Sequence, residues 1–127
     1  MNILNDRLYA KSHEWIKFED DGTAAIGISD FAQHAMGGIV FVELPEIGDL
    51  LEIGKGFAEV ESVKSVADIY APVGGVVREI NEELLDSPEL INKDPYGMWL
   101  VKLEAITEKG ELLEAAIYEQ VIETEEH

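Results

Sequence analysis

One stretch near the middle of the chain decides its fold, and it reads Phe57-Ala58-Glu59-Val60-Glu61-Ser62-Val63-Lys64-Ser65-Val66-Ala67-Asp68-Ile69-Tyr70-Ala71-Pro72. Before Ser62, small or branched apolar residues alternate with glutamates, which is the pattern of a β-strand with one face in water. A second strand-forming run begins at Val66. The chain must reverse between the two runs, so we predict a β-hairpin whose turn spans Ser62 to Ser65.

Lys64 lies inside the predicted turn. We expect Val63 and Val66 to pack beneath the turn and to hold the lysine out at its tip. This geometry suits a lysine that is presented to another protein. Most lysines in turns are only solvated, however, and the spacing alone does not overturn that interpretation.

The segments around this hairpin predict a mainly β fold. Two apolar runs flank Asp20-Asp21-Gly22, which is typical of a hairpin between Trp15–Phe18 and Thr23–Ile28. Short runs broken by glycine and proline between Leu50 and Ile80 favour a sandwich or barrel over alternating strands and helices. Further strands are predicted at 39–42 and 98–103.

Helices are predicted at three places. Ser29 is suited to cap a helix over residues 30–36, which Gly37-Gly38 would end. Ser87-Pro88-Glu89 has the composition of a second helix start, with serine as the cap. A final amphipathic helix at about 111–123 is expected to cover an open side of the β core. Its predicted apolar face consists of Leu112, Leu113, Ala116, Ile117 and Val121.

Composition excludes several classes of protein. A chain of 127 residues has room for one domain at roughly 100–200 residues per domain. It has no cysteine, which excludes thiolate metal sites and cysteine nucleophiles, and 27 acidic against 9 basic residues give a net charge of −18. That charge disfavours nucleic acid and anionic membranes as partners and favours basic proteins. We expect a monomer.

The first residues contain no basic start and no long apolar run, so no leader segment is predicted. No apolar stretch approaches the ~20 residues that a membrane-spanning helix needs. A cytoplasmic protein is therefore expected.

A metal hydrolase is the enzyme alternative. It would join His13, Glu14 and His34 around zinc, because imidazole and carboxylate are suitable ligands. The two histidines lie on different predicted elements, however, and His13-Glu14 lacks a second histidine at helical spacing. The third histidine, His127, is at the terminus. We therefore predict no metal site.

The chain resembles the glycine cleavage system H protein family. The similarity runs from about Tyr9 to Leu103. It rests on Ser12-His13-Glu14-Trp15, Gly27-Ile28-Ser29-Asp30-Phe31-Ala32-Gln33, Ile39-Val40-Phe41-Val42-Glu43-Leu44-Pro45, Glu61-Ser62-Val63-Lys64, Asp68-Ile69-Tyr70-Ala71-Pro72-Val73 and Pro88-Glu89-Leu90-Ile91-Asn92. The resemblance implies a barrel-sandwich hybrid of the lipoyl and biotinyl type, with short flanking helices and a C-terminal helix. We expect one domain over residues 1–127, with the β core at about 23–103.

The resemblance also implies a function. Lys64 would carry lipoate in amide linkage, and the chain would be a non-catalytic carrier. It would take the aminomethyl group of glycine from a pyridoxal-phosphate decarboxylase to an aminomethyltransferase and be reoxidised by the dihydrolipoyl dehydrogenase. A lipoate-attaching enzyme would be a fourth partner. An H-like lipoyl relay protein that serves another pathway remains the alternative.

Four more residues gain a role from the resemblance. Ser12, Glu14 and Asp68 correspond to positions that line a cleft for the loaded arm, where a carboxylate can hold an ammonium group. Glu61 precedes the lysine by three residues, as in lipoyl domains, and is a candidate for recognition by the attaching ligase. For Ser12, Glu14 and Asp68, sequence alone favours an N-terminal turn and an ordinary strand-edge acid over a cleft. Glu61 is equally consistent with a solvated strand residue.

Overall fold

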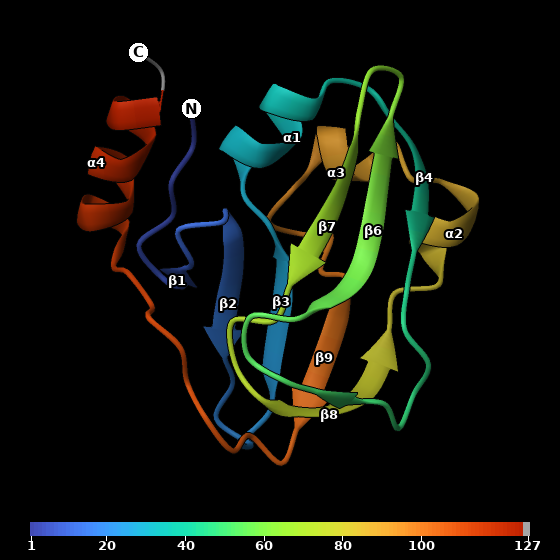
Figure 1. The fold of residues 1–127 in the computed structure, drawn as a ribbon, viewed down its shortest axis with the longest axis vertical. Helices are drawn as coiled ribbons and strands as arrows, with labels where there is room; N and C mark the ends of the chain where they lie inside the picture. Colours follow the sequence, from blue (N-terminus) through green and yellow to red (C-terminus); the bar gives the residue numbers. More distant parts are fainter. Residues whose placement is uncertain (126–127) are drawn as a thin grey trace.

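The structure, a computed structural model, describes residues 1–125 and folds them into two antiparallel β-sheets with short helices around them (Figure 1). The six-stranded sheet has the order β1-β2-β3-β9-β8-β5, and the three-stranded sheet has the order β4-β6-β7. The strands of the larger sheet are β1 (Leu8–Tyr9), β2 (Glu14–Phe18), β3 (Ala24–Ile28), β5 (Leu50–Leu51), β8 (Gly75–Ile80) and β9 (Val101–Glu104). Those of the smaller sheet are β4 (Ile39–Glu43), β6 (Gly56–Ser62) and β7 (Val66–Tyr70). The helices are α1 (Asp30–Met36), α2 (Glu83–Asp86), α3 (Leu90–Lys93) and α4 (Ala115–Glu125). The predicted mainly β class is confirmed.

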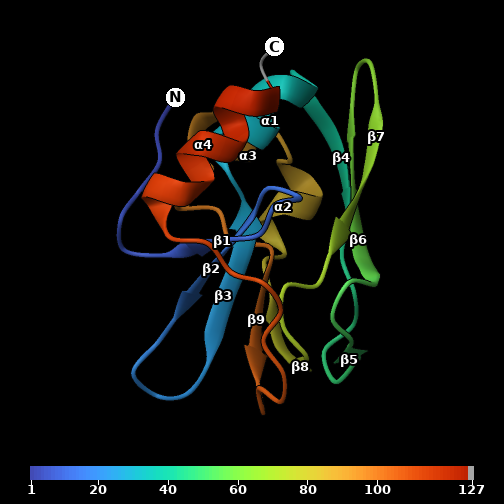
Figure 2. The ribbon, with the colours of Figure 1, turned by 60° about the vertical axis from the view of Figure 1, so that its left-hand side comes forward.

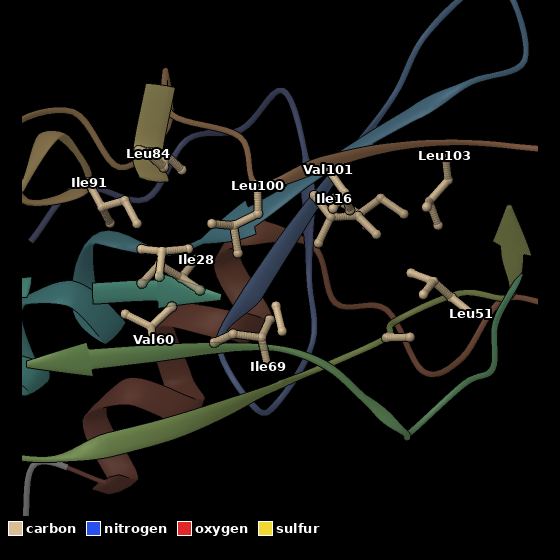
Figure 3. Packing of buried hydrophobic residues seen from close by; sticks show 14 of the residues in the cluster. Ile16, Ile28, Leu51, Val60, Ile69, Leu84, Ile91, Leu100, Val101 and Leu103 are labelled. Atoms are coloured by element: carbon tan, nitrogen blue, oxygen red, sulfur yellow. The ribbon is translucent and has the colours of Figure 1, made fainter. Parts of the chain in front are cut away.

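The two sheets share one apolar core (Figure 3). Val60 and Ile69 point into it from the three-stranded sheet, and Ile28, Val101 and Leu103 line it from the larger sheet. Each such aliphatic side chain contributes about 1.5–3 kcal/mol when it is fully buried. Because side chains alternate along a strand, this packing fixes which residues of the β6–β7 hairpin face outward.

Helix α1 confirms its predicted caps. The Ser29 hydroxyl accepts a hydrogen bond from the Ala32 N–H, and Gly37 ends the helix with a φ of 81° that glycine tolerates best. The hairpin that was predicted between Trp15 and Ile28 is also present, as β2 and β3.

The predicted helix start at Ser87 is wrong. The Ser87 N–H donates to the Glu83 carbonyl, so this residue ends α2, a helix that the sequence patterns did not predict. Helix α3 begins only at Leu90, and its N-terminal flanking residue Glu89 makes no side-chain capping bond. The structure thus has α2 before Ser87, where no helix was predicted, and α3 after it, two residues later than the predicted first helical residue Pro88.

Strand β9 starts three residues later than the predicted Met98. The Met98 N–H donates to the Asp94 carbonyl at 3.0 Å, and the Trp99 carbonyl accepts from the Asn81 side-chain amide at 2.9 Å. These bonds occupy the backbone groups that a ladder would need, so the chain joins β8 only from Val101.

Helix α4 starts later than predicted and buries a different face. Leu113 and Tyr9 exchange two backbone hydrogen bonds, of 2.7 and 2.9 Å, which keeps this segment extended. The helix packs with Ala115, Tyr118 and Ile122, whereas Ile117 of the predicted face is 47% exposed. The prediction counted aliphatic residues and missed the tyrosine, whose ring stacks on that of Tyr9 at 4.4 Å.

We predict that Gly27→Ala destabilises the fold. A Cβ at this buried strand position would lie 2.6 Å from carbons of the Trp15 ring, the cross-strand neighbour. The overpacking should lower the free energy of unfolding by about 1–3 kcal/mol in urea denaturation. Gly38→Ala is the matched control, because nothing lies within 4 Å of its added carbon. Equal stability of the two variants would contradict this packing.

Candidate functional site

The turn that carries Lys64 is fixed by Ser62. The Ser62 N–H donates to the Ser65 carbonyl at 2.8 Å, and the Ser62 hydroxyl oxygen accepts from the N–H groups of Ser65 at 3.0 Å and Lys64 at 3.3 Å. The Val63 N–H also donates to the Gly38 carbonyl, at 3.2 Å, which ties the turn to the chain after α1. Figure 1 shows the tip of the β6–β7 hairpin at one end of the molecule. The predicted hairpin and turn are confirmed.

The Lys64 side chain is exposed. Its Cε lies 3.4 Å from the position that a Cβ on Gly37 would take, so the missing side chain of this glycine leaves the lysine room. Among residues 1–125, no hydrogen bond or ion pair restrains its amine. The amine can therefore be approached from solvent.

The valines beside Lys64 do not pack beneath it as predicted. Val63 is 78% exposed and Val66 is 60% exposed. Val66 lies opposite Glu61, whose side chain faces away from the core, and cross-strand partners share a face. Hydrogen bonds of Ser62 therefore shape the turn, rather than apolar packing.

Ser12 and Glu14 come together at the other end of β7. Glu14 is only 1% exposed, and its carboxylate accepts hydrogen bonds from the Ser12 hydroxyl and from the Tyr70 N–H, the latter at 3.1 Å. Burial raises the pKa of Glu14, and these two bonds oppose that rise. A cleft of about 260 Å³ opens beside them, and its lining also includes Pro72 and Gly54.

Asp68 and Glu61 lie on the outer face of the three-stranded sheet. Asp68 is exposed, pairs with Glu59 across the ladder and does not line this cleft, although it is two residues from Tyr70 on the same strand. Glu61 is half-buried and lies between Phe41 and Val66. The structure thus groups Ser12 with Glu14, and Asp68 stands closer to the hairpin tip.

His13 belongs to a network that the sequence patterns did not reveal. Its Nδ1 lies 2.8 Å from the Tyr118 hydroxyl, which is also 2.6 Å from the Ser29 hydroxyl, and its Nε2 lies 2.8 Å from a Glu125 carboxylate oxygen. Burial raises the pKa of Tyr118, so this hydroxyl keeps its proton. His34 is exposed at the end of α1.

The residues of the hydrolase alternative therefore do not converge. Over residues 1–125, no three histidine, aspartate or glutamate side chains are placed to hold one metal ion. His127 lies outside the described residues.

Comparison with known proteins decides the family. A sequence model described as "Glycine cleavage H-protein" matches residues 7–125. The chain is 52% identical to the glycine cleavage system H protein of Lachnoclostridium phytofermentans, over 98% of each chain. A probable H protein of Pyrococcus furiosus is 48% identical over 91% of this chain and 89% of its own. The chain belongs to the glycine cleavage H-protein family.

The fold agrees with this membership. The crystal structure of a glycine cleavage system H protein from Mycobacterium marinum matches with a TM-score of 0.89 and 41% identity, covering 93% of this chain and 97% of that one. The predicted barrel-sandwich hybrid with a C-terminal helix is thereby confirmed.

The chain is accordingly a non-catalytic lipoyl carrier of the glycine cleavage system, as the resemblance predicted. Members of the family carry lipoyl-lysine. In the described part of the chain, no helix is long and apolar enough to cross a membrane.

We predict that Glu14→Gln changes how stability depends on pH. A carboxyl whose folded-state pKa is raised ionises more readily in the unfolded chain, so its ionisation costs stability as the pH rises through the usual glutamate range. Relative to the glutamine variant, the wild type should lose free energy of unfolding as the pH rises above the ordinary glutamate pKa of about 4.3. Urea denaturation across this range measures the difference, and a wild type that gains stability over the variant would refute it.

Proposed function

We propose that Lys64 is the residue on which this carrier bears lipoate. The observation that supports this proposal is the exposed, unrestrained amine in a turn that Ser62 holds rigid. The space beside Gly37 fits a lysine that must extend into a long arm. When bound, lipoate supplies a disulfide that can be reduced, can take up a one-carbon amine and can be reoxidised.

Attachment of lipoate is an acyl transfer in which the amine of Lys64 is the nucleophile. Its amine, in the neutral form, attacks the carbonyl carbon of an activated lipoyl group and forms the C–N bond. The bond to the leaving group breaks with its electron pair, and the amine releases its extra proton to a base. The attaching enzyme supplies the activated acyl group, and the carrier only presents the nucleophile.

The cleft at Ser12 and Glu14 suits an ammonium group. Glu14 has lone pairs left after it accepts from Ser12 and from the Tyr70 N–H, and a cation beside it would lower its raised pKa and favour the carboxylate. Asp68 would supply a second carboxylate on the path along β7 from the hairpin tip. We propose that Glu14 holds the amine end of the loaded arm in the cleft, away from water, and that Asp68 attracts it on the way there.

The partners follow from this role. We propose that the carrier serves glycine decarboxylase, the aminomethyltransferase and the dihydrolipoyl dehydrogenase in turn, after a lipoate-attaching enzyme has modified it. A rigid hairpin with a long arm raises the local concentration of the reactive group at each of them.

We predict that the wild type gains one lipoyl mass increment when it is incubated with a lipoate–protein ligase, lipoate and ATP. Lys64→Arg should gain none, because a guanidinium does not form this amide, while the fold is retained. Intact mass spectrometry measures the increment. Lys55→Arg is the control, since Lys55 is also exposed and lies just before β6. Modification of Lys64→Arg would disprove the assignment.

Loading separates this carrier from a relay protein of another pathway. The lipoylated chain, mixed with glycine decarboxylase and labelled glycine, should retain the label, and Lys64→Arg should not. A lipoylated wild type that takes up no label would point to a different pathway.

A further inference from the structure

Exposed apolar side chains gather around Lys64. Among residues 1–125, ten large hydrophobic residues are exposed, and four of them surround the hairpin turn. We call these four the tip patch: Val40, Phe41, Val63 and Val66. Phe41, Glu61 and Val66 form one row across the three strands, directly below the turn, and Val63 bonds to Gly38 just before β4. Exposed apolar patches of this kind mark sites of interaction with other molecules.

A β-bulge creates the patch. The register between β4 and β6 shifts between Ile39 and Phe41. As a result, Val40 and Phe41 are both exposed, at 54% and 48%, while Ile39 and Val42 on either side are buried. In a regular strand side chains alternate, so either Val40 or Phe41 would point into the core. Bulges beside functional positions commonly serve to redirect side chains in this way.

The surface below the patch is acidic. Strands β4, β6 and β7 contain four acidic residues and no basic one. Glu43, Glu59 and Asp68 lie opposite one another in a single row, and Glu61 lies within the apolar row. Like charges directly opposite each other destabilise a sheet. The tip patch and the acidic row below it therefore fit a partner whose surface has an apolar depression next to lysine or arginine side chains.

We propose that the tip patch docks the enzyme that attaches lipoate to Lys64. This inference rests on the proposed function of Lys64. The later partners meet the carrier through an arm that is already in place, whereas the attaching enzyme must bring its acyl group to the bare lysine amine. Its surface must therefore touch the residues beside Lys64, and these are the tip patch and Glu61.

The first test compares the rates of lipoyl transfer. Phe41→Thr/Val66→Thr removes two of the four apolar side chains of the tip patch and puts in residues that suit a strand. With a lipoate–protein ligase, lipoate and ATP, its kcat/KM should fall by at least about tenfold, chiefly through KM. Leu50→Thr, an exposed residue on β5, should stay within about twofold of the wild type. Urea denaturation shows that each variant folds. Wild-type kinetics in the double variant would overturn the proposal.

The second test measures docking without transfer. Lys64→Arg with an intact patch should inhibit lipoylation of the wild type competitively, and Lys64→Arg with Phe41→Thr/Val66→Thr should not. Equal inhibition by both proteins would overturn the proposal. So would normal lipoylation of the patch variant followed by slow loading from glycine, because that result would assign the patch to a later partner. A wild type that is not modified at Lys64 would instead refute the proposed function.

Discussion

The hydrogen bonds of Ser62 constrain the turn of the β6–β7 hairpin, which carries Lys64. One hydroxyl oxygen accepts two backbone N–H groups in a turn that few other contacts support, since the neighbouring valines face solvent. Beneath it, Val60 and Ile69 anchor the two strands in the core (Figure 3). Polar bonds fix the tip and apolar packing fixes the base. Lys64 at the tip therefore has an exposed side chain on a backbone whose conformation these hydrogen bonds define.

Glu14 provides the corresponding link at the other end of β7. It lies on the six-stranded sheet, and the N–H that it accepts comes from Tyr70 at the end of the three-stranded sheet. A buried carboxylate therefore joins the two sheets where the cleft opens. Such a group is costly to bury unless it is hydrogen-bonded, and both of its oxygens are. The same residue can thus serve the fold and the site.

Sequence patterns predicted the elements whose signals are local. The alternation in β6, the cap at Ser29 and the glycine at position 37 each act within a few residues, and all three are confirmed. Other errors arose where distant residues decide. Tyr9 holds Leu113 extended and so delays α4, and the Asn81 amide binds the Trp99 carbonyl ahead of β9. The His13 network joins residues more than 100 positions apart, which no spacing along the chain reveals.

The position of α4 also affects the order in which parts of the fold can be completed during synthesis. Figure 2 shows α4 on the opposite side of the molecule from the β6–β7 hairpin, and it completes a cluster with Tyr9 and Trp15 near the N-terminus. Synthesis runs from the N-terminus, so Tyr9 and Trp15 are made long before α4, the helix that packs against them. Until α4 has been made, these two aromatic side chains lack the helix that completes their cluster, on the opposite side of the molecule from the β6–β7 hairpin.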